Sequence, residues 1–298
     1  MYNKGTHSVT HLSAAKTFSF QLNGGLIFFE AMLNGQLDTF VLDTGSPGLL
    51  LNEPIDLECE SNYSAVGVNS DLTFQKKKGH RFQVANVVKK NLSSLSINME
   101  HLEKLKNQKF KGMVGQRIFA THELLLDYKT NRISLLNGGQ KERVENAQRT
   151  EAIPIEQQQH FAVIKIKIGK RSYNFGIDTG AEVNIIDDDL AHRLSPKKFK
   201  KTKKIKIRGV SQQGSHAQVG EITEVAFGSQ TLNDLPFVAM DMRTLNKGKG
   251  MKLDGLLGYP FLSSGLFSID YIAKKFYIWS RVIEQDRTPP TPLLTQEN

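Results

Sequence analysis

The sequence of 298 residues contains a single cysteine, Cys59. One cysteine excludes an internal disulfide framework, because each bridge needs two thiols. No apolar run approaches the length of a membrane-spanning helix, and the N-terminal segment has neither the apolar core nor the cleavage site of a signal peptide. We therefore expect a cytoplasmic protein without a membrane span, and an exported mature form stays open.

Several common catalytic patterns are absent as well. There is no Gly-x-Ser-x-Gly elbow, no His-Glu-x-x-His run and no glycine-rich phosphate loop, and the histidines are scattered. Nothing in the sequence pairs Cys59 with a histidine, so we interpret it as an inert thiol. These absences argue against the usual serine, cysteine and zinc hydrolases, and no cofactor or metal is expected.

Acidic residues are too few to balance the basic ones, which gives a net charge of +9. Much of the excess comes from Lys76–Lys78 and from residues 196–208, PKKFKKTKKIKIR. Such runs can bind phosphates. No interleaved aromatic residues, helix-turn-helix or zinc-finger spacing accompany them, so exposed loops are the favoured reading. We expect no nucleic-acid partner, and keep a nucleic-acid-associated protein as the weakest function hypothesis.

The sequence repeats one short motif. Asp43-Thr44-Gly45 returns as Asp178-Thr179-Gly180. Each copy ends an apolar segment that reads as a β-hairpin, with a turn at Asn34-Gly35 in the first copy and at Gly169-Lys170 in the second. A single Asp-Thr-Gly after a strand can be a plain turn in which the aspartate caps the backbone. Two copies in matching surroundings indicate a duplication.

The similarity continues downstream of each copy. An apolar-apolar-Gly segment ends at Gly115 in the first half and at Gly258 in the second. Asp127-Tyr128 follows Gly115 by twelve residues, and Asp270-Tyr271 follows Gly258 by the same twelve. Each Asp-Tyr pair precedes a predicted closing strand. Equal spacing at both ends is difficult to explain without two homologous halves.

The β-branched runs and frequent turns predict an all-β fold. We expect an N-terminal lobe over 1–140, a linker over 141–152, a C-terminal lobe over 153–281 and a flexible tail over 282–298, with a separate core in each lobe. One short helix is expected over Asp187–Leu194, with its acids at the positive end of the helix dipole. Asp187, Asp188 and Asp189 could also suggest a metal site, but they lack a spaced ligand pattern.

The doubled Asp-Thr-Gly and doubled apolar-apolar-Gly motifs resemble those of the two-lobed aspartic peptidases. The form Asp178-Thr179-Gly180-Ala181 is similar to the retropepsins, and the lobe size is similar to bilobal retropepsin-like proteases of bacteria. The resemblance covers nearly the whole chain apart from the linker and the tail. It implies two homologous β-barrel lobes with an active-site cleft between them.

The resemblance also implies a mechanism. Asp43 and Asp178 would be the catalytic pair, sharing one proton because two adjacent carboxylates cannot both ionise cheaply. One carboxylate would deprotonate a water, and the other carboxyl group would protonate the scissile carbonyl. Supporting roles fall to the rest of the two loops and to the two glycines of the apolar segments: Thr44, Gly45, Ser46, Thr179, Gly180, Ala181, Gly115 and Gly258.

Two features bear on activity. Flap candidates are residues 66–84, which lack the tyrosine of pepsin-like enzymes, and residues 208–219, although either can be an ordinary surface hairpin. The hydroxyl of Ser46 is expected to donate a hydrogen bond to Asp43, which Ala181 cannot do for Asp178.

We expect a monomeric aspartic endopeptidase with pseudo-two-fold symmetry that acts on peptides or proteins. The alternative is a non-catalytic peptide-binding module that keeps the fold.

Overall fold

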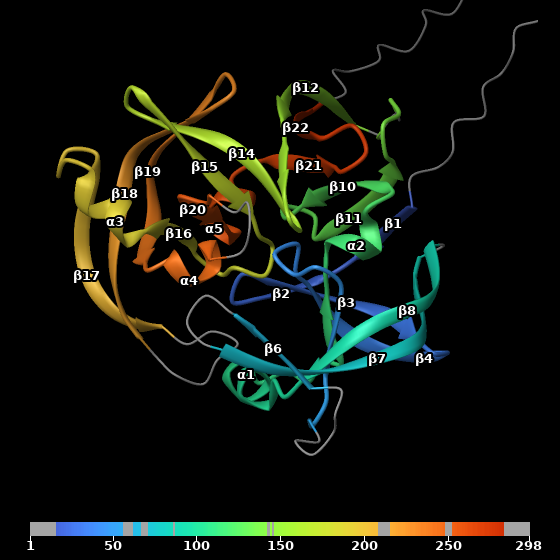
Figure 1. The fold of residues 1–298 in the computed structure, drawn as a ribbon. Helices are drawn as coiled ribbons and strands as arrows, with labels where there is room; N and C mark the ends of the chain where they lie inside the picture. The colour runs from blue at the N-terminus through green and yellow to red at the C-terminus, as the bar shows by residue number, and fades with distance from the viewer. Residues whose placement is uncertain are drawn as a thin grey trace, which may run out of the picture.

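The computed structural model describes residues 16–55, 62–66, 71–85, 87–141, 144, 146–207, 215–247 and 252–282. Cys59, the N-terminal segment and all but the first residue of the predicted tail lie outside these residues. The fold is all-β, as the sequence predicts, and it is built from three sheets (Figure 1).

The first half of the chain forms an eight-stranded sheet, which we call the N-terminal barrel. A pairing between its second and seventh strands closes six of the eight strands into a ring. In spatial order the strands are β2 (Gln21–Asn23), β3 (Leu26–Leu33), β4 (Gln36–Leu42), β9 (Gly112–Val114), β5 (Leu49–Asn52), β8 (Val87–Ile97), β7 (Asp71–Val84) and β6 (Asn62–Val66).

The second half repeats this topology strand for strand, and we call it the C-terminal barrel. Its ring is closed by the equivalent pairing of β14 with β18. In spatial order the strands are β13 (Glu156–Gln158), β14 (Phe161–Ile168), β15 (Arg171–Ile177), β20 (Gly255–Leu257), β16 (Asn184–Asp187), β19 (Gln230–Met240), β18 (Ser215–Phe227) and β17 (Phe199–Ile207). Matching order and closure confirm the two homologous β-barrel halves.

A third, six-stranded sheet takes three strands from each half, and we call it the shared sheet (Figure 1). Its two central strands, β10 and β21, are antiparallel and come from different halves. In spatial order the strands are β1 (Lys16–Ser19), β11 (Arg132–Asn137), β10 (His122–Asp127), β21 (Leu266–Asp270), β22 (Lys275–Arg281) and β12 (Ala147–Pro154).

The shared sheet changes the expected organisation of the chain in two ways. Residues 147–152, which the sequence assigns to the linker, form most of β12 and pair with β22. The expectation of separate cores is wrong, because the largest cluster of buried apolar side chains is continuous from Phe40 of the N-terminal barrel through Leu124 of the shared sheet to Phe175 of the C-terminal barrel. The lobe boundaries themselves stay a prediction.

Five short helices connect the strands in the described residues: α1 (Glu100–Lys106), α2 (Gln116–Phe119), α3 (Asp188–Arg193), α4 (Arg243–Asn246) and α5 (Tyr259–Leu262). The predicted helix is present as α3, and Asp188 and Asp189 lie in its first turn. Helices α2 and α5 are equivalent, since each begins directly after the glycine of an apolar-apolar-Gly segment.

The local sequence explains why the hairpins turn where they do. Asn34 and Gly35, between β3 and β4, both have positive φ angles, of 54° and 90°. Asn and Gly adopt this conformation at little cost, and it matches the twist of a two-residue hairpin. Gly169, between β14 and β15, has a φ of 61°. Both turns therefore send the following strand back across the barrel toward an aspartate.

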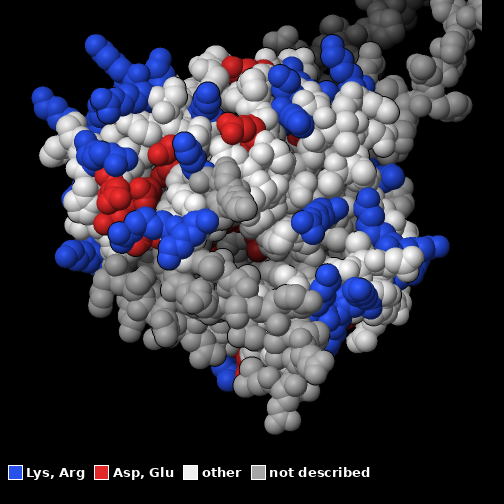
Figure 2. Space-filling model, viewed as in Figure 1, with Lys and Arg blue, Asp and Glu red and all other residues white. Residues whose placement is uncertain are grey.

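Most of the two lysine-rich runs lies on strands and not on the loops that the sequence suggested, although residues 196–198 form a turn before β17. Lys76–Lys78 belong to β7, and Lys200–Lys204 are exposed residues of β17. Strand β17 is an edge of the C-terminal barrel sheet, and charged lysines at an edge discourage pairing with another chain. In Figure 2, Lys and Arg side chains are spread over much of the visible face, while acidic side chains gather near α3.

Candidate active site

The two Asp-Thr-Gly loops follow equivalent strands and are held in equivalent ways. Asp43 comes directly after β4, and its N–H donates to the carbonyl of Val114 at 3.0 Å. Asp178 comes directly after β15, and its N–H donates to the carbonyl of Leu257, also at 3.0 Å. Each strand runs parallel to the apolar-apolar-Gly strand of its own half. Asp43 and Asp178 therefore follow directly on the ends of equivalent buried strands in the two halves.

Reciprocal hydrogen bonds join the two loops through their threonines. The Thr44 hydroxyl accepts from the N–H of Thr179 at 3.0 Å, and the Thr179 hydroxyl accepts from the N–H of Thr44 at the same distance. Each hydroxyl also donates to the carbonyl before the opposite aspartate, on Ile177 and on Leu42. Both threonines are 1% exposed. Four buried bonds thus fix one loop on the other.

Each glycine of the motif lies against the aspartate of the other half. A Cβ on Gly45 would lie 2.5 Å from Cγ of Asp178, and a Cβ on Gly180 would lie 2.5 Å from Oδ1 of Asp43. Real Cβ atoms do not approach other atoms so closely. A side chain at either position would overlap the opposite aspartate, so both positions require glycine. The short distance between each glycine and the opposite aspartate also places the two carboxyl groups at the junction of the halves.

The two carboxyl groups lie close together, since a Cβ on Gly180 would lie within 3.2 Å of an oxygen of each, and each shifts the pKa of the other. Burial raises the pKa of Asp43 well above its usual range, and the charge and hydrogen bond of Asp178 raise it further. The N–H groups of Gly45 and Ser46 oppose this by stabilising the ionised form. Burial also raises the pKa of Asp178, against hydrogen bonds from Gly180, Asp43 and Gly45. Such a pair titrates as one unit and can hold one proton between two groups.

The residues that follow the two motifs differ from the expectation. The Ser46 hydroxyl is buried and has no hydrogen-bond partner among the described residues, so the predicted donation from this hydroxyl to Asp43 is wrong. The backbone N–H of Ser46 acts on the Asp43 carboxyl instead. Ser46 and Ala181 therefore supply no side-chain donor on either side, and the asymmetry expected from them disappears.

Gly115 and Gly258 pack directly beneath the loops. A Cβ on Gly115 would lie 2.2 Å from the carbonyl oxygen of Ser46, and one on Gly258 would lie 2.4 Å from that of Ala181. The N–H groups of the next residues, Gln116 and Tyr259, donate to the same two carbonyls. The apolar-apolar-Gly segments thus support both loops through backbone contacts that a side chain would block.

The sequence match agrees with this geometry. Residues 164–261 match the family model described as aspartyl protease. Residues 164–261 belong to the retropepsin-like aspartyl protease family. The matched range lies in the C-terminal half, where it begins in β14, includes Asp178 and Gly258, and ends in α5. No curated protein matches the chain. The first half lies outside the matched range and is related to the second by topology and by the repeated motif.

Two polar residues near the two Asp-Thr-Gly loops were not predicted from the sequence. Asn184, fully buried, accepts from the N–H of Gly258 at 2.9 Å and donates to the carbonyl of Pro236. The sequence marks Asn184 only as a single amide side chain at the start of an apolar strand, β16. His160, before β14, packs on the ring of Phe161; burial lowers the pKa of its imidazole, and the nearby backbone of Gly45 in the other half opposes this. A contact between residues so distant in the sequence has no local signal.

Other predicted features lie elsewhere or outside the described residues. The tips of both flap candidates, residues 67–70 and 208–214, are not described. Among the described residues, no group of three or more His, Cys, Asp or Glu side chains is arranged to hold a metal ion. No helix in the described part of the chain is long and apolar enough to cross a membrane.

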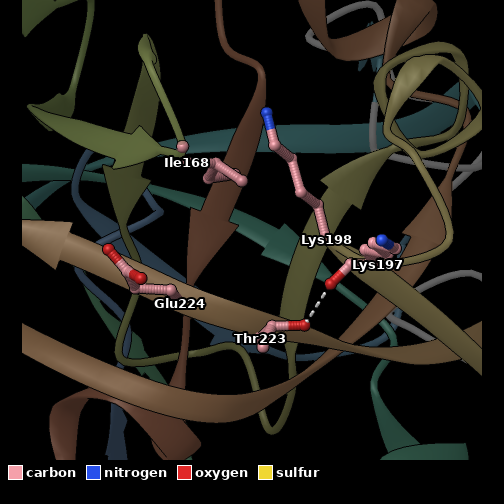
Figure 3. A pocket seen from close by; sticks show the side chains of 6 residues that line it. Ile168, Lys197, Lys198, Thr223 and Glu224 are labelled. Atoms are coloured by element: carbon pink, nitrogen blue, oxygen red, sulfur yellow. Dashed lines mark hydrogen bonds between the residues drawn. The ribbon is translucent and has the colours of Figure 1, made fainter.

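A surface hollow of about 170 Å³ lies on the C-terminal barrel, away from the two aspartates (Figure 3). Lys197 and Lys198 line one side of it, with Glu224 opposite, and Thr223 donates to the carbonyl of Lys197. The mixed charge of its lining gives the hollow no preference for an anion. This part of the basic run is accordingly solvated surface.

Proposed function

We propose that the protein is an aspartic endopeptidase in which Asp43 and Asp178 activate a water for attack on a peptide bond. The observation that carries the proposal is the close approach of two buried carboxyl groups from different halves, on loops joined by the Thr44 and Thr179 bonds. A carboxylate pair in a buried position is costly, and a module that only bound peptides would gain nothing from it.

The raised pKa values of the pair suit this chemistry. Because both are raised, the pair retains a proton at a pH where isolated aspartates have lost theirs. The ionised partner accepts a proton from the water, and the protonated partner donates to the oxygen of the scissile carbonyl. Neither residue bonds covalently to the substrate. The peptide would lie in the cleft that the sequence predicts between the halves, extended so that its backbone can form hydrogen bonds.

The test is cleavage of an unbiased peptide library by wild type, Asp43→Asn, Asp178→Asn and the double variant. We expect each single variant to lose activity as completely as the double, because the shared proton needs both groups. Asp234→Asn is the matched control. Asp234 lies on an exposed part of the C-terminal barrel with a φ of 49°, which asparagine tolerates, so activity should be retained.

The outcomes separate the two functions that the sequence left open. Near-normal turnover in either single variant would show that the pair is not catalytic. If wild type cleaves nothing but binds library peptides, and Asp43→Asn binds them equally well, the protein is a peptide-binding module instead of a peptidase.

A further inference from the structure

Three hydrogen bonds hold the loop of Asp43 on the segment around Gly115. The N–H of Asp43 donates to the carbonyl of the residue before Gly115 at 3.0 Å, and the N–H of the residue after Gly115 donates to the carbonyl of Ser46 at 3.0 Å. Between them, the N–H of Gly115 donates to the carbonyl of Gly48 at 2.8 Å. In the first half all three bonds therefore join backbone groups.

The second half keeps the outer two bonds and replaces the middle one. The N–H of Asp178 donates to the carbonyl of the residue before Gly258 at 3.0 Å, and the N–H of the residue after Gly258 donates to the carbonyl of Ala181 at 2.9 Å. The N–H of Gly258 itself donates to the side-chain oxygen of Asn184 at 2.9 Å. One side chain thus does in this half what a backbone carbonyl does in the other.

The amide of Asn184 is fixed at both ends. Asn184 is fully buried, and its side-chain N–H donates to the carbonyl of Pro236 in β19 at 3.0 Å while its oxygen accepts from Gly258. These partners specify one orientation of the amide, with the oxygen toward Gly258. Strand β19 pairs with β16 on one side and with β18 on the other. Asn184 therefore ties Gly258 to an interior strand of the C-terminal barrel.

The counterpart of Asn184 in the first half is Leu49. Each of the two residues stands six positions after the aspartate of its own half and begins the equivalent strand, β16 or β5. Leu49 is buried and its side chain has no polar atom, but none is needed, because the carbonyl of Gly48 takes the bond. The pseudo-two-fold symmetry therefore relates a buried amide to an apolar side chain.

Gly258 lies between the two residues that hold the loop of Asp178. Its own N–H has a single anchor on the barrel, the side chain of Asn184, among the hydrogen bonds of the described residues. Within the loop, the N–H of Gly180 donates to Oδ1 of Asp178 at 2.9 Å. A shift of Gly258 would move both outer contacts of the loop and would change the distance between the Gly180 N–H and the carboxyl group.

We propose that Asn184 is a positioning residue, which holds Gly258 beneath the loop and thereby keeps the Gly180 N–H on the carboxyl group of Asp178. This inference rests on the proposed function of the pair. It gives the two aspartates unequal support, because the loop of Asp43 is held by the backbone and the loop of Asp178 also depends on one side chain.

The role requires a hydrogen-bond acceptor and no charge. An asparagine side chain does not titrate, so a pH effect of removing it has to arise in the aspartate pair. Hydrogen bonds to a carboxylate lower its pKa, so a weaker bond from Gly180 raises the apparent pKa values of the pair. The other charged group of this loop, Glu182, is ion-paired with Lys106 of the other half at 2.6 Å and is the same in every variant.

The experiment compares Asn184→Leu, which keeps the branched shape without a donor or acceptor, with Asn184→Asp, which keeps an oxygen for the Gly258 N–H. The matched control is Asn246→Leu on α4. The Asn246 amide forms the same two kinds of bond, with the N–H and the carbonyl of Leu253 at 2.9 and 2.8 Å. Both leucine variants leave backbone groups unpaired, so both should lower the melting temperature.

Only Asn184→Leu should act on the aspartate pair. We expect the acid limb of its kcat/KM profile to move to higher pH by about half a unit or more, and kcat to fall roughly tenfold with KM little changed. Asn246→Leu should keep the wild-type profile. In Asn184→Asp, burial favours the protonated carboxyl, which accepts from Gly258 and donates to Pro236 as asparagine does, so kcat at acidic pH should stay within about threefold of wild type.

A second readout does not depend on catalysis. The aspartate carboxyls, labelled with ¹³C, can be titrated by NMR, and the apparent pKa values of the pair should rise in Asn184→Leu and match wild type in Asn246→Leu. Wild-type titration curves and a wild-type pH profile in Asn184→Leu would overturn the proposal.

Two further outcomes are distinguishable. If Asn184→Leu does not fold, Asn184→Asp decides, because a loss of kcat as large as that expected for Asn184→Leu, in a variant that keeps the acceptor for Gly258, would also overturn the proposal. If wild type cleaves no peptide, the proposed function fails, while the NMR titration of Asn184→Leu still decides the role of Asn184.

Discussion

The threonine bonds between the loops allow a quantitative prediction for Thr44→Val. Valine has nearly the same shape as threonine but no hydroxyl. The substitution removes the bond from the N–H of Thr179 at 3.0 Å and the bond to the carbonyl of Ile177 at 3.2 Å. Because Thr44 is 1% exposed, water cannot replace the lost hydroxyl.

The expected loss follows from what remains unpaired. A buried polar group that loses its partner costs about 1–3 kcal/mol, and a carbonyl, with two lone pairs, loses less than an N–H. Thr44→Val should therefore lower the free energy of unfolding by roughly 2–4 kcal/mol. In a chain of 298 residues, with roughly 2 cal/mol/K of unfolding entropy per residue, that lowers the melting temperature by roughly 3–6 °C. Thr179→Val should cost a similar amount, because its bonds are equivalent.

Differential scanning calorimetry and urea titration would measure this loss. Thr150→Val is the control, because the Thr150 hydroxyl donates to a strand carbonyl, that of Ile278, from an exposed position on β12. Its loss should stay below about 1 kcal/mol, since water can take over. A Thr44→Val variant that loses no more than Thr150→Val would refute the argument that these bonds join the halves.

Further predictions concern the same loops. Gly45→Ala should abolish peptide cleavage, because the new Cβ would overlap the Asp178 carboxyl. In the control Gly48→Ala the new Cβ has no atom within 4 Å, so this variant should cleave peptides normally and give the circular dichroism spectrum of wild type. The raised pKa of Asp43 means that the folded state holds its proton more tightly than the unfolded state, so this residue destabilises the protein as pH rises above about 4. Asp43→Asn should accordingly raise the melting temperature at pH 7, and the gain should vanish below about pH 4; a constant gain at all pH values would contradict this. Ser46→Ala should leave the pH profile of kcat/KM unchanged, because the Ser46 hydroxyl has no hydrogen-bond partner among the described residues. A shift of the acid limb in this variant would show that the hydroxyl does donate to Asp43. Treatment with EDTA should leave cleavage intact, and loss of activity restored by zinc would rule out the carboxylate mechanism.

The repeat made most of the fold predictable. The spacing from Gly115 to Asp127 equals that from Gly258 to Asp270, and it predicted both closing strands, β11 and β22, because motif and strand are local in the sequence. The turn at Asn34-Gly35 was readable for the same reason, since its residues favour positive φ.

The shared sheet could not be read from the sequence. Its pairing of β10 with β21 joins residues more than 140 positions apart, and nothing local in Glu123–Leu126 specifies the partner. The same holds for His160, which lies near the backbone of Gly45 in the other half. A backbone group leaves no trace in a side-chain pattern. Ser46 failed for another reason: the residue type was right for a donor, but the hydroxyl has no acceptor among the described residues.

The strand order of the shared sheet has a consequence for the origin of the molecule. The order β1-β11-β10 on one side mirrors β12-β22-β21 on the other, and the central register pairs Leu125 with Ser268. These two residues stand two positions before Asp127 and Asp270, so each is the counterpart of the other, and the symmetry axis passes through this pair. An ancestor that carried only one half could pair this strand with a second copy of itself in the same register. The two sides of the present sheet are therefore related as two subunits of a symmetric dimer would be, but because they belong to one chain, a substitution on one side leaves the other side unchanged.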